Sequence, residues 1–195
     1  YFTGSVELMI IKDAFIEMQS RYLKILNNYY PAHESTGFTE RNLTNNFVAS
    51  MEKIIGNNCI SWFEAPITDK ESLHVDAIIF DLSSKTLFII EAKRLKSVSN
   101  LGSVRDDIVR MHTKNYISKL EDELIDIQIN KRFAIVLADV WTENDATKNI
   151  YKNWPKCIAG EDFYYSDKLG FESVNRENEW KRKYNILIAV DEIKI

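Results

Sequence analysis

The stretch that decides the fold reads His74-Val75-Asp76-Ala77-Ile78-Ile79-Phe80-Asp81, then Leu82-Ser83-Ser84-Lys85-Thr86, then Leu87-Phe88-Ile89-Ile90-Glu91-Ala92-Lys93. Its two apolar runs are strand-like, and the polar break between them is of the kind that closes a hairpin. Both runs also carry carboxylates, which are rarely buried without a partner or a metal. The stretch therefore predicts two paired strands that carry a polar site.

Side-chain alternation along the second run brings an acid and a lysine together. Residues two apart on a strand share a face, so Glu91 and Lys93 project to the same side. Asp76 joins them only if the hairpin register is right, because directly paired residues point the same way and a slip of one residue reverses every side chain. The position of the loop therefore decides whether the three polar groups meet.

An even-numbered loop satisfies this condition. If the loop is Ser84-Lys85, or all of Ser83–Thr86, Leu82 pairs with Leu87, and counting back places Asp76 opposite Lys93. A three-residue loop would put Asp76 on the wrong side of the sheet. We therefore expect an even loop within Ser83–Thr86 and all three polar groups on one face.

Two carboxylates and a lysine on one face have a clear chemical use. Carboxylates bind hard divalent cations, and a neighbouring lysine can act on a water or a phosphate. Acid-x-Lys at a strand end is common by itself, and most such residues form a solvated strand terminus. Asp76, however, lies within Val75–Leu82, a run that otherwise has the character of a buried strand, and this context favours a metal site.

An acid within one apolar strand, followed by Glu-x-Lys at the end of the next, resembles the PD-(D/E)xK nuclease superfamily. The resemblance covers roughly Thr39–Val140. It implies an α/β, restriction-endonuclease-like fold: an αβββαβ core whose mixed central sheet is flanked by helices. It also implies that Asp76 and Glu91 hold Mg²⁺ or Mn²⁺, and that Lys93 orients or deprotonates a water or stabilises developing negative charge.

Glu40 is the candidate for a third carboxylate. It lies in the first turn of a predicted helix and shares the inward stripe of Leu43 and Phe47. An acid at this place is often only a partner of the helix dipole. Many members of the superfamily carry a glutamate on the first core helix that reaches towards the metal, and Glu40 matches that position, so the resemblance adds it to the metal ligands.

Apolar periodicity predicts the order of elements. The second helix is expected to be capped by Thr39 and ended by Gly56. The helices are expected at about 6–29, 39–55, 103–127 and 143–154, and the strands at about 59–67, 73–82, 87–93, 133–140 and 184–190. We expect one domain over residues 1–195, with an N-terminal helix at about 5–29, a core at about 39–140 and a C-terminal extension at 141–195.

Composition limits the class of protein without deciding its function. The 195 residues are 45% hydrophobic and 28% charged, as in a soluble globular protein. No apolar run approaches the roughly 18 residues of a membrane span, and no signal sequence opens the chain, so we expect an intracellular, cytoplasmic protein without a membrane partner. Cys59 and Cys157 lack metal-ligand spacing and are expected to be reduced.

A net charge of −4 argues against a nucleic-acid partner, because phosphate binding usually needs a basic surface. The distribution of charge matters more than the total, and Lys93–Lys114 holds six cations against two acids. A second cluster is Lys181-Arg182-Lys183. Either run could be a solvated face. From the first run we take, as candidate phosphate-binding residues, Arg94, Lys96, Arg105 and Arg110.

Two further observations bear on the substrate. One branch of the superfamily carries Gln-x-x-x-Tyr on the helix after the Glu-x-Lys strand, and His112 and Tyr116 have that spacing here, with histidine in place of glutamine. On one helix face they could flank the site, or be a surface histidine beside a packed tyrosine. The segment 160–183 scatters aromatic residues among charges, which can stack on bases or anchor a surface excursion to the core.

These observations predict a Mg²⁺- or Mn²⁺-dependent nuclease that acts on nucleic acid, DNA more readily than RNA. A homodimer is left open. One rival interpretation is a catalytically inactive nucleic-acid- or protein-binding module on the same fold. The other is an unrelated α/β protein in which Asp76 and Lys93 form a structural ion pair.

Overall fold

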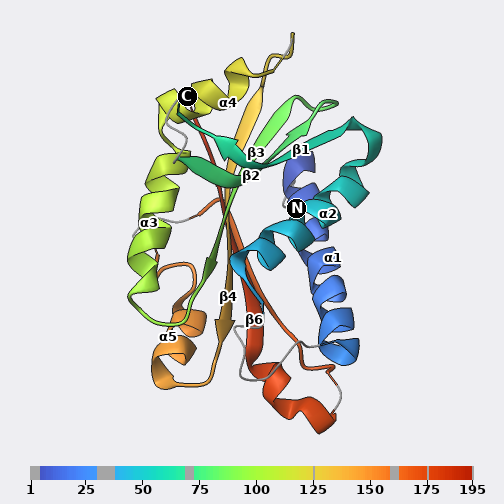
Figure 1. Ribbon diagram of the computed structural model, residues 1–195, viewed down its shortest axis with the longest axis vertical. Helices are drawn as coiled ribbons and strands as arrows, with labels where there is room; N and C mark the ends of the chain where they lie inside the picture. Colours follow the sequence, from blue (N-terminus) through green and yellow to red (C-terminus); the bar gives the residue numbers. More distant parts are fainter. Residues whose placement is uncertain are drawn as a thin grey trace.

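The described residues form a mixed six-stranded sheet with helices on both faces (Figure 1). The computed structural model describes residues 5–29, 38–68, 73–124, 126–158, 163–174 and 176–194. The strands are β1 (Cys59–Pro66), β2 (His74–Asp81), β3 (Thr86–Arg94), β4 (Lys131–Trp141), β5 (Tyr165–Gly170) and β6 (Tyr184–Glu192), in the spatial order β1-β2-β3-β4-β6-β5. β3 and β4 are parallel, and the other neighbouring pairs are antiparallel. The predicted α/β class and mixed sheet are confirmed.

The helices divide between the two faces of the sheet (Figure 1). One face is covered by α1 (Val6–Asn28) and α2 (Glu40–Ile55), and the other by α3 (Asn100–Met111), α4 (Lys114–Asp122) and α5 (Asp145–Asn153). Two short 3-10 helices, η1 (Gly56–Asn58) and η2 (Arg176–Lys183), precede β1 and β6. The predicted ends of α2 are confirmed. Thr39 accepts a hydrogen bond from the Asn42 N–H, and Gly56 ends the helix with a φ of 76°.

Alternation along the central strands builds a separate apolar core on each face. Phe88 and Ile90 pack on the α1/α2 side with Phe47, whereas Ile89 packs on the α3 side with Val104. Because β3 and β4 are buried on both faces, both read as nearly continuous apolar runs in the sequence. A polar side chain within these runs therefore has to find its partner inside the protein.

The β2–β3 hairpin differs from its predicted register by two positions. Asp81 pairs with Thr86, and the loop is residues 82–85, so the predicted loop within Ser83–Thr86 and the predicted pairing of Leu82 with Leu87 are wrong. The cause is the Asp81 carboxylate, which accepts hydrogen bonds from the Ser83 N–H and from both serine hydroxyls and so starts the turn earlier. Because the shift is of two residues, each side chain stays on its predicted face of the sheet. The observed register, however, leads Asp76 towards Glu91 and not towards Lys93.

Two other element predictions are wrong. The helix expected at 103–127 is α3 and α4, separated at Thr113, whose backbone is extended and whose hydroxyl donates to the Val109 carbonyl. Threonine competes in this way with the helix backbone and favours a helix start. β5 was not predicted, because its polar, half-buried sequence at the sheet edge gives no apolar pattern. Part of the segment 160–183 lies outside the described residues; within the described part, Phe171 is buried and stacks on Tyr184.

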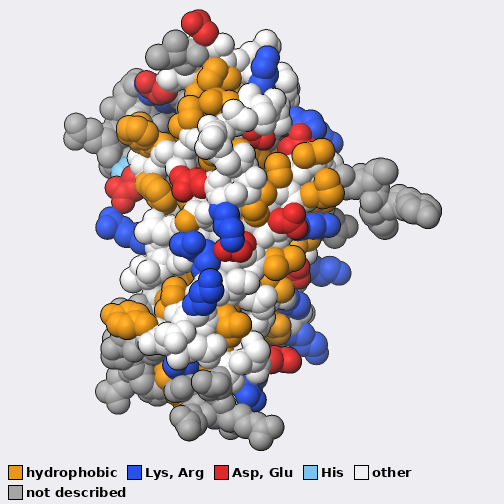
Figure 2. All heavy atoms as spheres, turned by 90° about the vertical axis from the view of Figure 1, so that its right-hand side faces the viewer, with side chains coloured by type: hydrophobic (Ala, Val, Ile, Leu, Met, Phe, Trp, Pro, Cys, Tyr) orange, Lys and Arg blue, Asp and Glu red, His pale blue; other side chains and the backbone are white. Residues whose placement is uncertain are grey.

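On the side covered by α1 and α2, basic, acidic and apolar side chains are interspersed (Figure 2). Among the described helices, even the 23-residue α1 lacks the uninterrupted apolar length that a membrane crossing requires. Cys59 and Cys157 are free thiols, both half-buried.

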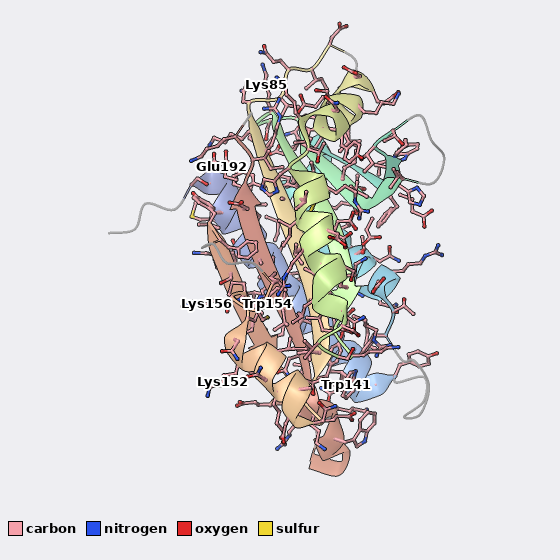
Figure 3. The ribbon with its side chains drawn as sticks, turned by 90° about the vertical axis from the view of Figure 1, so that its left-hand side faces the viewer. Lys85, Trp141, Lys152, Trp154, Lys156 and Glu192 are labelled. Carbon is pink, nitrogen blue, oxygen red and sulfur yellow. The ribbon has the colours of Figure 1, made fainter. Side chains whose placement is uncertain are left out.

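The sheet is long in the strand direction. Lys85, in the loop before β3, lies at one end of the molecule, and Trp141, the last residue of β4, lies near the other (Figure 3). Glu91 and Lys93 lie between these ends, in the second half of β3. This position is where β2 separates from β3 and where the chain turns towards α3.

Candidate functional site

Asp76 marks the point where β2 separates from β3. The two strands pair from Asp81 and Thr86 up to Ala77 and Ile90. Beyond that pair, Asp76 Oδ2 accepts a hydrogen bond of 2.7 Å from the Ala92 N–H and thereby satisfies a backbone donor of β3. The side chain of Asp76 is thus held against the part of β3 that carries Glu91.

Glu91 is almost completely buried, at 2% exposure. Burial, together with the negative charges of Asp76 and Asp107, raises the pKa of Glu91 to about 8, although Arg110 acts in the opposite direction. Burial also raises the pKa of Asp76, against the effects of the Ala92 N–H and of Lys93. The two carboxyl groups lie close enough to perturb each other, and they repel when both are ionised.

Lys93 is paired with an acid that the sequence analysis did not single out. Its Nζ lies 3.0 Å from Oδ2 of Asp107, a buried residue of α3. Burial would lower the pKa of Lys93, but the ion pair with Asp107 outweighs this effect, and the pKa is raised. Lys93 therefore holds its proton at neutral pH.

Asp107 also orients Arg110, one turn further along α3. Arg110 Nη2 lies 2.5 Å from Asp107 Oδ1 and 2.6 Å from Glu91 Oε1. A continuous chain of charge thus runs from Lys93 through Asp107 and Arg110 to Glu91. Asp107 could have been found from the sequence, because it lies on the inward stripe of Leu101, Val104 and Met111, where a carboxylate needs a partner.

Glu40 lies near this group but does not join the two carboxylates. Its Oε1 accepts a hydrogen bond of 3.1 Å from the Arg94 N–H at the end of β3. Its charge is close enough to raise the pKa of Asp76 and to support the raised pKa of Lys93. Within the described part of the chain, no three His, Cys, Asp or Glu side chains are grouped as a metal would require.

The donors that fit a divalent cation are therefore Asp76 and Glu91. Both are carboxyl groups whose pKa values are raised chiefly by burial, and a positive charge between them would favour their ionised forms. Mg²⁺ commonly uses only one or two protein carboxylates and completes its octahedron with water and substrate oxygens. The residues present therefore fit such an ion, with Arg110 as its competitor for Glu91.

The remaining residues named from the sequence divide into two groups. Arg94 and Lys96 line a pocket next to Glu40. Arg105 donates hydrogen bonds to the carbonyls of Cys157 and Ile158 and so ties α3 to the segment after α5. The site thus gathers only some of the predicted basic residues.

The prediction that His112 and Tyr116 share one helix face is wrong. α3 ends at Met111, and Tyr116 belongs to α4. The His112 ring contacts the Ile108 carbonyl through Nδ1 and Asp191 Oδ2 through Nε2, at 3.1 Å. This histidine links α3 to the end of β6 and does not face the carboxylates of β2 and β3.

The second basic cluster, Lys181-Arg182-Lys183, is partly internal. Lys181 is buried and donates to the Leu26 carbonyl, and Arg182 donates to the Val174 carbonyl at 3.1 Å. These contacts join η2 to α1 and to the segment that precedes η2. They give two of the three cations a structural role.

Another buried carboxylate, Asp139 of β4, lies on the opposite face of the sheet from Glu91. Tyr184 donates a hydrogen bond of 3.0 Å to its Oδ2, and Arg94 Nε lies 3.6 Å away. Burial raises the pKa of Asp139 to about 7, against the effects of Arg94 and Tyr184. Asp139 thereby anchors Arg94, which in turn presents its backbone N–H to Glu40.

Comparison with known proteins gave no match, whether with protein-family models, with curated proteins or with solved structures.

Proposed function

We propose that this chain is a Mg²⁺- or Mn²⁺-dependent nuclease that hydrolyses phosphodiester bonds in DNA, built on a PD-(D/E)xK core of α2, β1 to β4 and α3. The observation that carries the proposal is the position of the half-buried Asp76 beside the buried Glu91, both with raised pKa values, at the point where β2 leaves β3. Removing two neighbouring carboxyl groups from water costs free energy, and their ionised forms repel each other. A cation that binds both would favour the ionised forms and offset that cost.

A divalent cation bound there would polarise a phosphate and lower the pKa of a water. The residues of the chain supply the rest. Lys93 is kept protonated by Asp107, so it is suited to stabilise negative charge on the phosphate and not to remove a proton. Asp107 acts through Lys93 and Arg110 and is a positioning residue.

Arg110 has a role that depends on the cation. Without a metal its guanidinium lies 2.6 Å from Glu91 Oε1 and acts to lower the pKa of that carboxyl group, against the effect of burial. When Glu91 takes a cation, Arg110 retains Asp107 and can turn towards a phosphate, because the two contacts use the same Nη2 and leave other donors of the guanidinium for a new partner. Arg110 and the metal therefore compete for one carboxylate.

The main rival is a non-catalytic module on the same fold. It is favoured by the Arg110 ion pair, which already balances the charge of Glu91, and by the lack of a three-ligand group among the residues described. The other rival, a structural Asp76–Lys93 ion pair, is less well supported, because the salt bridge of Lys93 is with Asp107 and Asp76 bonds to the backbone of β3.

The test is incubation with plasmid, linear duplex DNA, single-stranded DNA and RNA, each with Mg²⁺, Mn²⁺ or EDTA. Asp76→Asn and Glu91→Gln serve as the variants, and Glu7→Gln serves as a matched control, because Glu7 is a buried carboxylate of α1 that pairs with Lys131 away from the site. The proposal expects metal-dependent cleavage that both site variants lose and the control keeps. Metal-independent cleavage, or no cleavage of any substrate, contradicts it.

A further inference from the structure

A pocket of about 550 Å³ opens beside the candidate site, beyond the end of β3. It is lined by Thr39, Glu40, Arg41, Arg94, Lys96 and Asn100. Glu40 belongs to both regions, because its charge acts on Asp76 and Lys93 while its carboxylate bonds to the backbone of Arg94. The pocket therefore lies close to the carboxylate pair.

The pocket carries three cationic side chains against one carboxylate. Arg94 is fixed, since its side chain is only 14% exposed and lies against Asp139. Arg41 is 83% exposed and pairs with Glu64 at 2.9 Å, a surface ion pair that contributes little and can exchange partners. Lys96 makes no ion pair with the described residues. The fixed Arg94 and the two cationic side chains that can change partners, Arg41 and Lys96, suit an anionic ligand.

The backbone around the pocket adds to this positive potential. α2, with 16 residues, begins at Glu40, and α3, with 12 residues, begins at Asn100, so both helices present their N-terminal ends to the pocket. Helix N-termini favour anions, because their first N–H groups point outward and the helix dipole is positive there. The Asn100 side chain accepts hydrogen bonds from the Lys96 and Ser97 N–H groups and fixes the loop that carries Lys96.

We propose that this pocket binds a backbone phosphate of a nucleic-acid strand, next to the phosphate that is cleaved, with Arg94 as a fixed contact and Arg41 and Lys96 as exposed contacts. The inference rests on the proposed function for the identity of the cleaved phosphate. The strand then crosses the end of β3 from the carboxylate pair to the N-termini of α2 and α3. Specificity for a base is not required, because phosphate contacts position a strand without reading its sequence.

The test is the salt dependence of DNA binding, measured by fluorescence anisotropy with labelled duplex and single-stranded oligonucleotides in EDTA, where metal-dependent cleavage is absent. Each phosphate contact contributes about 0.9 to the slope of log K against log salt for duplex DNA and about 0.7 for single strands. Arg41→Ala and Lys96→Ala are each expected to lower the slope by about one contact, and the double variant by about two.

Lys85→Asn is the matched control. It removes one positive charge from the opposite end of β3, roughly 30 Å from Lys96 along the strand (Figure 3). Asparagine also tolerates the left-handed backbone of Lys85, whose φ is 55°. The slope of this variant is expected to equal that of the unchanged protein, since only net charge differs.

Three outcomes overturn the inference: no DNA binding by the unchanged protein, an unchanged slope in the double variant, or an equal loss in Lys85→Asn. Inorganic phosphate provides a further arm. If it raises the melting temperature of the unchanged protein but not of the double variant, while the DNA slopes stay equal, the pocket takes a free anion instead of a strand. Slopes that fall as expected in a protein without cleavage activity would support the pocket and reject the nuclease.

Discussion

Glu91 and Asp139 are two buried carboxylates on adjacent strands, and the sheet separates them. Both have raised pKa values, about 8 and about 7, chiefly because both are buried, and each has an arginine partner. Asp139 has a tyrosine hydroxyl as its other hydrogen-bond partner. Glu91 lies instead beside two further carboxylates, Asp76 and Asp107.

The difference separates a structural carboxylate from one that can take a ligand. The partners of Asp139 complete its hydrogen bonding within the protein, so it can hold Arg94 without another ion. Asp76, Glu91 and Asp107 form a group of three acids whose cationic partners among the described residues are Lys93 and Arg110, so acidic groups outnumber basic ones. Burial alone is therefore a weak sign of function, whereas burial with crowded like charges is a strong one.

The largest expected effect is on cleavage. Asp76→Ala, Glu91→Ala and Lys93→Ala should each lower the rate of metal-dependent cleavage by about 100-fold or more, because each removes a part that the others cannot replace. The rate is measured on linear DNA in Mg²⁺ and Mn²⁺, with circular dichroism to verify folding. Glu7→Gln, the control away from the site, should retain activity within a few-fold. Full activity in the Asp76 or Glu91 variant would refute the assignment.

The second effect concerns stability, for which the Asp139 variant is expected to lose more than the Glu91 variant. Asp139→Ala should lower the free energy of unfolding by about 3 kcal/mol, because it leaves the Tyr184 hydroxyl and Arg94 without their buried partner. Glu91→Gln should cost much less at pH 7 in EDTA, because a pKa of about 8 already keeps Glu91 largely protonated and glutamine keeps an oxygen acceptor for Arg110. Urea denaturation of both variants measures the difference. An equal loss in the two would mean that both carboxylates are structural.

The third effect is metal-induced stabilisation. A cation that binds only the folded protein stabilises it by about 2.7 kcal/mol at about 100 times its dissociation constant, and for a chain of this size each kcal/mol raises the melting temperature by about 2 to 4 °C. Mn²⁺ should produce such a shift in the unchanged protein and in Asp139→Asn. Asp76→Asn should lose most of it, and a full shift in that variant would locate the metal elsewhere.

The fourth effect is on the pH dependence of stability in EDTA. The folded pKa of Glu91, about 8, lies above its ordinary value of 4.5, so the folded protein binds the extra proton. This contribution is complete below about pH 4.5 and is lost as the pH rises to about 8, at no more than about 1.4 kcal/mol per pH unit. Asp139 acts in the same direction up to about pH 7. Thermal unfolding between these limits should show a falling melting temperature.

Two variants separate the contributions of Glu91 and Asp139 to the fall in melting temperature with pH. Glu91→Gln should remove the part that extends to about pH 8, and Asp139→Asn the part that ends near pH 7. Acids whose pKa values are lowered, such as Glu7 and Asp81, lose their contribution only below their ordinary values of 4.5 and 3.8 and do not interfere. A melting temperature that rises across this range would contradict both assignments.

Much of the fold could be predicted because local signals were sufficient. The stripe of α2, its threonine cap and its glycine end are short-range features, and β3 is apolar throughout because it is buried on both faces. The hairpin register could not be predicted, since it depended on which of several polar groups the Asp81 carboxylate binds. β5 could not either, because an edge strand with half-buried polar residues has no apolar period.

Only the part of the candidate site that lies on the β2–β3 hairpin could be predicted from the sequence. Asp76, Glu91 and Lys93 lie within a short stretch, and side-chain alternation brings them together. The partners of Glu91 and Lys93 come from α3, and their approach depends on how that helix packs on the sheet. The sequence predicted Arg110 as a phosphate-binding residue from its charge, but its contact with Glu91 depends on tertiary packing. Arg41 is on α2 and Asp139 is on β4. The contacts of these elements with their neighbours depend on tertiary packing, which residue spacing along the chain does not predict.

The smallest effect is expected for Glu40, which stands between the two faces compared above. Its charge acts on both Asp76 and Asp139, yet its own hydrogen bond is to the Arg94 backbone. Glu40→Gln preserves that acceptor and removes only the charge, so cleavage should fall by less than about 10-fold, the scale of about 1.4 kcal/mol. Glu40→Ala should fall further, since it also frees the end of β3. If Glu40→Gln is as damaging as Glu91→Gln, Glu40 is a metal ligand in the working enzyme, and the cation site extends from the hairpin to α2.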